Sequence, residues 1–182
     1  MQITPSSVEI FDRDGTAVER PRTRISEAVE AADKGDFDHY MLKEIYEQPH
    51  ALGATFGGAA NYLQLEESFG HGAGEMFDRV ENVQIVACGT SFHAGMVARY
   101  WLEELAGVAC EVEVASEFRY REPPITPGTA ALFVSQSGET ADTLAAMRHC
   151  KENGQTIAVI VNVPTSSMAR EADLLLPIHA GP

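Results

Sequence analysis

The stretch Leu-Phe-Val-Ser-Gln-Ser-Gly-Glu-Thr-Ala-Asp-Thr, residues 132–143, decides the fold. It lies at the end of a short apolar run that starts at Ala130, and such a run is typical of a strand buried on both faces. Residues 135–140, here called the hydroxyl turn, contain three hydroxyl side chains, one amide and a glycine. Residues 140–152 then show helical spacing, which Gly154 ends. A strand that leads through a polar turn into a helix is a repeating unit of α/β folds.

The same alternation of strand and helix continues on both sides of this stretch. Apolar runs predict strands, and apolar residues three or four positions apart predict helices. The expected strands are residues 83–87, 111–115, 130–134, 156–161 and 172–178, and the expected helices are residues 91–106, 140–152 and 166–171. This order predicts a parallel sheet covered by helices on both faces. In the first of these helices, we expect Met96, Tyr100 and Trp101 to lie in the core.

Two strand-to-helix turns have the composition of an anion site. In an open parallel sheet, ligands bind beyond the carboxyl ends of the strands. The first turn is Cys88-Gly89-Thr90-Ser91, where Gly89 permits a tight turn and two hydroxyls lie at a helix N-terminus. The second is the hydroxyl turn, whose hydroxyl and backbone N–H groups can satisfy phosphate oxygens without a metal or a basic residue. Helix capping by Thr90 or Ser91 is the alternative, but a cap needs only one such residue.

Three other residues near these turns have competing interpretations. Glu139 suits the first turn of a helix, but its charge would repel a phosphate, so we expect it to point away from the ligand. Cys88 could be a reactive thiol at a helix N-terminus, although a small residue filling the end of a buried strand explains it better. His93 is interpreted as a helix-surface residue rather than a catalytic base.

Composition excludes several classes of function. The net charge of −14 and the pI near 4.7 disfavour nucleic acid and anionic membrane surfaces as partners, because both require clustered Lys and Arg. Cys88, Cys110 and Cys150 form no C-x-x-C pair, which argues against a zinc site or a disulfide framework. We therefore expect no metal. Neither G-x-G-x-x-G nor the P-loop pattern occurs, which disfavours a nucleotide cofactor.

The sequence shows neither a membrane-spanning segment nor an N-terminal signal peptide that we can identify. No stretch reaches the roughly 18 apolar residues of a membrane span. Residues 1–12 lack a basic segment followed by an apolar run, so we expect no signal peptide and a cytoplasmic protein.

The first 82 residues show a different pattern. Residues 1–20 predict a β-hairpin, in which Asp14-Gly15 forms the turn. Residues 21–38 are polar and predict a linker. A helix is expected from His39, and Pro49 either kinks it or begins the next one. Its apolar face consists of Met41, Leu42, Ile45 and Tyr46. Further helix, interrupted by glycines, is expected over residues 61–82.

Four segments together resemble a known family. They are Val-Ala-Cys-Gly-Thr-Ser at 86–91, residues 132–143, His39 to Pro49, and Ala-Ser-Glu-Phe-Arg-Tyr-Arg at 115–121. These motifs resemble the sugar isomerase (SIS) family and, within it, the isomerase domain of glutamine–fructose-6-phosphate aminotransferases. The resemblance extends from about Asp33 to the end of the chain. The hairpin at 1–20 is similar to the last hairpin of that enzyme's glutaminase domain.

The resemblance implies a three-layer α-β-α SIS fold with a five-stranded parallel sheet. It also implies that the chain takes part in hexosamine biosynthesis, where glucosamine 6-phosphate is made from fructose 6-phosphate and glutamine. The resemblance implies no metal or organic cofactor, and it implies a homodimer. The residues that would hold the sugar phosphate are Ser91, Ser135, Gln136, Ser137 and Thr140. The residues that would contact the sugar are Cys88, Gly89 and Thr90.

The sequence also departs from the family pattern. The family's glutaminase nucleophile is an N-terminal cysteine, but residue 2 here is Gln2. The family's isomerisation lysine, glutamate and histidine lie in a second half, which follows the position of Pro182. We therefore assign no catalytic residue. Residues 39–182 are expected to form a first SIS subdomain that is incomplete at its C-terminus. Alone, it is expected to bind ligand weakly or not at all and to be inactive.

Two alternatives remain open at this stage. SIS folds also serve as non-catalytic sugar-phosphate sensors in regulators, and as plain phosphosugar isomerases. A regulator would be favoured by a basic helix-turn-helix upstream, whereas residues 1–38 are acidic and hairpin-like. The helix at 39–49 resembles the aminotransferases more closely than the plain isomerases.

Overall fold

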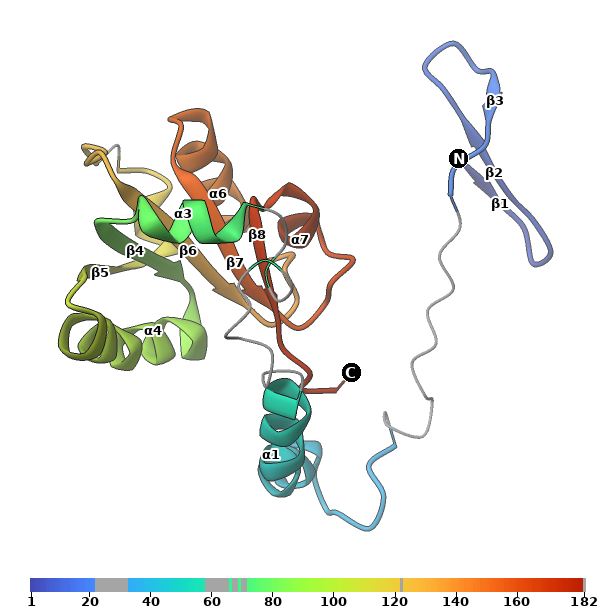
Figure 1. Ribbon diagram of the computed structural model, residues 1–182. Helices are drawn as coiled ribbons and strands as arrows, with labels where there is room; N and C mark the ends of the chain where they lie inside the picture. The colour runs from blue at the N-terminus through green and yellow to red at the C-terminus, as the bar shows by residue number, and fades with distance from the viewer. Residues whose placement is uncertain (22–32, 58–65, 67–68, 70–71, 122, 182) are drawn as a thin grey trace. The chain divides into compact units, whose positions relative to one another are not determined.

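The computed structural model describes residues 1–21, 33–57, 66, 69, 72–121 and 123–181. The chain divides into two compact units, residues 1–33 and residues 34–181 (Figure 1). Most of the predicted linker, and most of the first part of the helix predicted over residues 61–82, lie outside the described residues.

The first unit contains a small antiparallel sheet in the order β1-β2-β3, formed by Gln2–Ile3, Val8–Phe11 and Ala17–Val18. The predicted hairpin corresponds to β2 and β3. Its turn is closed by Asp12, whose Oδ1 accepts from the backbone N–H groups of Asp14 at 2.9 Å and Thr16 at 2.8 Å. Strand β1 was not predicted, because two residues are too short to show a period.

The second unit is built on a five-stranded parallel sheet in the order β5-β4-β6-β7-β8. The strands are β4 Asn82–Ala87, β5 Ala109–Val114, β6 Thr129–Ser135, β7 Thr156–Val161 and β8 Leu174–Pro177. The predicted α/β fold with five parallel strands is confirmed. The central strands β4, β6 and β7 coincide with apolar runs of the sequence, since a parallel sheet buries both faces of its central strands. The edge strand β5 instead alternates apolar residues with Glu111 and Glu113.

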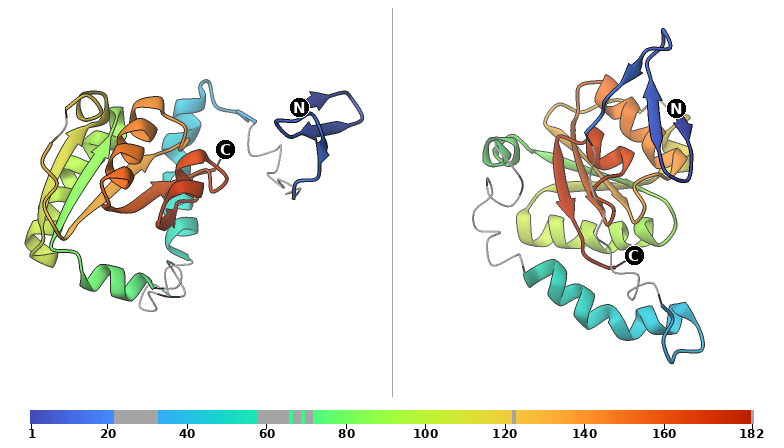
Figure 2. Two further views of the ribbon diagram at one scale, coloured as in Figure 1. Left: turned by 90° about the horizontal axis from the view of Figure 1, so that it is seen from above. Right: turned by 90° about the vertical axis from the view of Figure 1, so that its right-hand side faces the viewer.

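Helices cover both faces of this sheet (Figure 2). On one face lies α4, Gly89–Trp101, which continues as the π-helical turn η3, Leu102–Ala106. On the other face lie α5 Ala115–Phe118, α6 Ala141–Glu152 and α7 Ser167–Glu171. The main core forms between these three helices and the sheet. Its largest members are Phe118, Phe133, Met147, Ile157 and Met168, all at most 1% exposed.

Helix α4 corrects one prediction. Met96, Tyr100 and Trp101, which were expected in the core, are 47%, 69% and 62% exposed. The buried stripe of α4 instead contains Gly95, where an added Cβ would lie 2.9 Å from Cγ2 of Ile85. Because this small residue brings the helix close to β4, the large side chains on the other side of the helix face outward.

Two further helices precede the sheet. Helix α1, Tyr40–Gly57, begins where predicted and runs through Pro49 without ending, and none of its described residues is buried. Its residue Thr55 accepts a hydrogen bond at Oγ1 from the backbone N–H of His179 at 3.0 Å. Helix α3, Ala73–Asp78, leads into β4. Among the described helices, none has the length and apolar character to cross a membrane.

Candidate functional site

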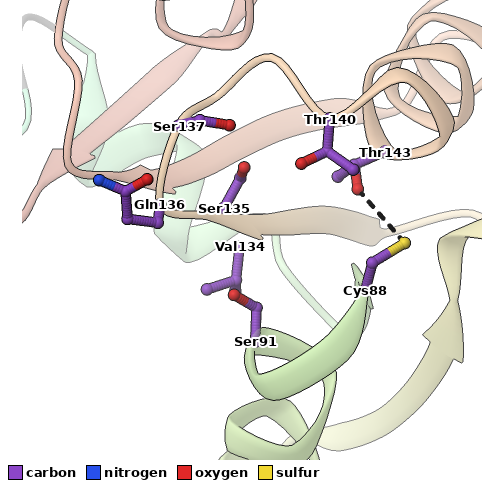
Figure 3. A pocket seen from close by; sticks show the side chains of 8 residues that line it. All are labelled: Cys88, Ser91, Val134, Ser135, Gln136, Ser137, Thr140 and Thr143. Carbon is purple, nitrogen blue, oxygen red and sulfur yellow. Dashed lines mark hydrogen bonds between the residues drawn. The ribbon is translucent and has the colours of Figure 1, made fainter. Parts of the chain in front are cut away.

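The two turns singled out in the sequence meet at one edge of the sheet. Strand β4 has β5 on one side and β6 on the other, so the strand order reverses there, which is where ligands bind in open α/β sheets. A cavity of about 240 Å³ lies at this point (Figure 3). It is lined by Cys88, Ser91, Val134, Ser135, Gln136, Ser137, Thr140 and Thr143.

The hydroxyl turn is preorganised by its own hydrogen bonds. Ser135 is 5% exposed, and its Oγ accepts from the backbone N–H of Gly138 at 3.0 Å. The Oγ of Ser137 accepts from the backbone N–H of Glu139 at 3.2 Å. The hydroxyls of Ser135, Ser137 and Thr140 converge on one space (Figure 3). These bonds fix the turn before any ligand arrives.

Helix capping does not account for the hydroxyls. The N-cap residue of α6 is Thr140 and that of α4 is Cys88, and neither makes a side-chain capping hydrogen bond. The first N–H groups of α6 therefore have no side-chain acceptor from the N-cap, which leaves them available to an anion. The capping alternative for Thr90 and Ser91 is thus not supported, because Cys88 occupies that position.

Gly138 is required by its surroundings. Its φ is +65°, and an added Cβ would lie 2.1 Å from Oγ and 2.6 Å from Cβ of Ser166. Its carbonyl accepts from the backbone N–H of Met168 at 3.2 Å, and the carbonyl of Gln136 accepts from the backbone N–H of Asn162 at 3.2 Å. The hydroxyl turn is therefore held against the segment that follows β7.

The two carboxylates nearest the start of α6 are engaged away from the cavity. Oε1 of Glu139 accepts from the backbone N–H of Ser167 at 2.6 Å, as expected for a residue that points away from the ligand. Oδ1 of Asp142 accepts from Nη1 of Arg119 at 2.6 Å. Neither carboxylate lines the cavity. The cavity wall therefore carries no negative side chain that would oppose an anion.

The hydrogen bond from Ser167 also lowers the pKa of Glu139 from its ordinary value of 4.5. Because the pKa is depressed in the folded state, this group stabilises the fold above its unfolded-state pKa, and the contribution is lost as the pH falls through the folded-state value. We expect Glu139→Gln to lower the urea midpoint at pH 7, with the difference from wild type shrinking below pH 4.5. Glu152→Gln, at an exposed carboxylate ending α6, should change little. An equal loss at pH 3 and pH 7 would contradict this role.

The structure separates the predicted site residues into two groups. The five predicted phosphate contacts and Cys88 all line the cavity, whereas Gly89 and Thr90 are exposed at the start of α4 and do not. The sequence analysis missed Val134 and Thr143. Helical spacing could have revealed Thr143, because it lies three residues after Thr140 on the same face. Its Oγ1 lies 3.8 Å from Sγ of Cys88 and joins the two turns.

The chemical capacity of this cavity is binding rather than proton transfer. Among the described residues that line it, Cys88 alone has an ionisable side chain. In the described part of the chain, no group of three or more His, Cys, Asp or Glu side chains could hold a metal ion. Neutral hydroxyl, amide and backbone donors therefore make up the recognition surface, which suits the several acceptor oxygens of a phosphate group.

Comparison with known proteins agrees with this geometry. The family described as the SIS domain matches residues 76–182. The chain belongs to the SIS domain family. The SIS chain is also 55% identical to the glutamine–fructose-6-phosphate aminotransferase (isomerizing) of Pseudomonas aeruginosa. That alignment covers 100% of this chain and 30% of the aminotransferase, so the chain spans about a third of the relatives that it matches.

Solved structures show the same relationship. The C-terminal domain of glucosamine-fructose-6-phosphate aminotransferase from Francisella tularensis superposes with a TM-score of 0.74 at 44% identity, covering 82% of this SIS chain and 43% of that structure. Glucosamine-6-phosphate deaminase from Thermotoga maritima has a TM-score of 0.61 at 23% identity, covering 77% and 40%, and shows the fold alone. The predicted resemblance to the SIS region of the aminotransferases is confirmed.

Proposed function

We propose that this SIS chain binds the sugar phosphate in an aminotransferase that makes glucosamine 6-phosphate from fructose 6-phosphate and glutamine. The observation that carries the proposal is the convergence of the hydroxyls of Ser135, Ser137 and Thr140 beside the N-terminus of α6. Three hydroxyls and the open backbone N–H groups of a helix match a phosphate dianion. Similarity to the aminotransferases over the full chain supports fructose 6-phosphate and glucosamine 6-phosphate as the sugars.

Each site residue predicted from the sequence has a proposed role. Ser91, Ser135, Gln136, Ser137 and Thr140 hold the phosphate, and Ser91 approaches it from the α4 side of the cavity. Cys88, Gly89 and Thr90 contact the sugar, with Gly89 and Thr90 at the exposed start of α4. Because Cys88 alone is ionisable among the described lining residues, the acid and base for ring opening and isomerisation would come from groups outside this part of the cavity wall.

The proposal includes the organisation of the protein. Residues 1–20 correspond to the end of a glutaminase domain, residues 21–38 to a linker, and residues 39–182 to the first SIS subdomain. A cytoplasmic homodimer is part of the same proposal. The exposed Met96, Val97, Tyr100, Trp101 and Leu105 on α4 and η3 supply apolar area that an interface with a second copy needs.

The proposal is tested by calorimetric titration of the purified chain with glucosamine 6-phosphate and, separately, with glucosamine. We expect saturable heat with the phosphate ester and none with the free sugar. Ser137→Ala should weaken binding roughly 10- to 100-fold, because a hydrogen bond to a charged group contributes about 1.5–3 kcal/mol. Ser116→Ala, which changes a serine outside the cavity lining, is the matched control. No heat at millimolar ligand from a folded protein would overturn the proposal that this chain alone forms the phosphate site.

A further inference from the structure

The first turn of α6 carries a carboxylate close to the cavity. Asp142 stands beside Thr143 in the sequence, and both Thr140 and Thr143 line the cavity. Consecutive Cα atoms are about 3.8 Å apart, so the Asp142 carboxylate lies within roughly 8 Å of Thr143. This distance is about the screening length at physiological ionic strength. A free carboxylate here would therefore oppose an anion at this end of the helix.

Arg119 neutralises this carboxylate from a neighbouring element. Its Nη1 donates to Oδ1 of Asp142 at 2.6 Å, across 23 residues of sequence. Arg119 directly follows α5, which itself follows the carboxyl end of β5, so it lies at the edge of the sheet that carries the cavity. The guanidinium is also stacked on the ring of Tyr120, with 4.8 Å between the guanidinium carbon and the ring centre. The cation is thus held at two points.

The other arginines nearby are engaged elsewhere. Nη2 of Arg121 donates to Oε1 of Glu113 on β5, and Arg148 donates to both carboxylate oxygens of Glu171. Among the ion pairs between described residues, that of Arg119 alone reaches the first turn of α6. Its two side chains are 30% and 39% exposed, and such pairs contribute little to stability. We therefore expect its main effect on the charge beside the cavity.

We propose that Arg119 is a positioning residue for phosphate binding, which holds the Asp142 carboxylate and cancels its charge so that the first turn of α6 can accept a dianion. This inference rests on the proposed sugar-phosphate function. Without Arg119, the free carboxylate would repel the phosphate. Without Asp142, the freed guanidinium would attract it. Removal of both side chains leaves the local net charge as in wild type, so the two single changes should have opposite effects that cancel in the double variant.

The test is calorimetric titration of the full chain with glucosamine 6-phosphate at an ionic strength of about 10 mM. Arg119→Met should weaken binding about five- to tenfold, the Coulomb effect of one charge on a dianion about 8 Å away in water. Asp142→Asn should strengthen binding by a similar factor. The double variant should bind within about twofold of wild type. In about 1 M NaCl, where the screening length is about 3 Å, the differences among the four proteins should fall to about twofold or less.

Arg99→Met is the matched control for loss of a paired arginine. Nε of Arg99 donates to Oε1 of Glu103 at 2.9 Å, so the same kind of ion pair is broken. Arg99 lies eight residues after Ser91 in α4, which is about 12 Å along the helix axis and beyond the screening length at physiological ionic strength. We expect an affinity within about twofold of wild type.

The double variant separates charge from structure. A purely structural role for Arg119 would leave the double variant at least as weak as Arg119→Met, and that result would overturn the inference. Unchanged affinity in Arg119→Met, with wild type binding normally, would also overturn it. If Arg119→Met does not fold, Asp142→Asn decides alone, because tighter binding supports the inference and unchanged or weaker binding overturns it. Absence of phosphate-dependent heat in wild type would overturn the proposed function and this inference together.

Discussion

Replacing Gly138 by alanine should destabilise the second unit by roughly 2–4 kcal/mol, because left-handed backbone strain costs about 1 kcal/mol and overpacking about 1–3 kcal/mol. The alanine methyl group would lie 2.1 Å from Oγ of Ser166 and 2.8 Å from Cγ2 of Val161, with φ at +65°. Relief of this clash requires the hydroxyl turn to move away from the segment after β7. Sugar-phosphate affinity should therefore fall together with stability, as urea denaturation and the glucosamine 6-phosphate titration would show.

Gly154→Ala is the matched control for this effect. Gly154 has φ at +78°, but no atom lies within 4 Å of an added Cβ. The backbone strain is therefore present and the clash is absent. We expect a loss of about 1 kcal/mol with unchanged ligand binding. If the two variants were equally destabilised, the close contact with Ser166 would have no energetic consequence, and our account of the turn would be wrong.

Phe133→Ala should have the largest effect on stability of the substitutions considered, a loss of about 3–5 kcal/mol in the free energy of unfolding. Phe133 is 0% exposed in the middle of β6 and belongs to the core between the sheet and α6. Its removal leaves a cavity directly before the hydroxyl turn. The measurement is urea denaturation followed by circular dichroism, which gives the midpoint and the dependence of the free energy of unfolding on urea concentration. An equal slope of that dependence in variant and wild type would confirm that unfolding exposes the same surface area in both.

An exposed aromatic residue provides the control for Phe133. Tyr120 is 77% exposed, and Arg119 stacks on its ring with 4.8 Å between the guanidinium carbon and the ring centre. Tyr120→Ala should therefore cost no more than about 1 kcal/mol. A comparable loss in both variants, or a Phe133→Ala loss below about 1 kcal/mol, would show that this core is far less tightly packed than the structure indicates.

The phosphate recognition that we propose for this acidic chain would rest on local arrangement rather than on net charge. The chain carries a net charge of −14, yet Glu139 and Asp142 at the start of α6 are bound by Ser167 and Arg119. Distant charges are screened over about 8 Å at physiological ionic strength, so the groups within the cavity decide what binds. Neutral hydrogen-bond donors can bind an anion when, as here, the cavity wall carries no unpaired carboxylate that would repel it.

The amino-acid sequence by itself determined the class of fold and the position of the candidate site along the chain. The strands at 83–87, 130–134 and 156–161 were predicted to within two residues at each end. Their signals are local, since apolar runs and glycine stops act over a few neighbouring residues. The two turns that line the cavity could also be identified from the sequence. The clearer of them is residues 135–140, which contain three hydroxyls directly after a buried strand, whereas a helix cap uses a single hydroxyl.

Only the tertiary structure decided which side chains face one another. Glu139 meets Ser167, which is 28 residues away along the chain, and Gly138 must be a glycine because of Ser166. The outward face of α4 likewise follows from the contact of Gly95 with Ile85. That Oε1 of Gln155 has no hydrogen-bond partner among the described residues likewise follows only from the way the neighbouring strands pack around it. Such contacts depend on how segments that are distant in sequence pack against one another. The spacing of apolar residues along the chain shows which side of a helix or strand is buried, but not which residues of other elements it contacts.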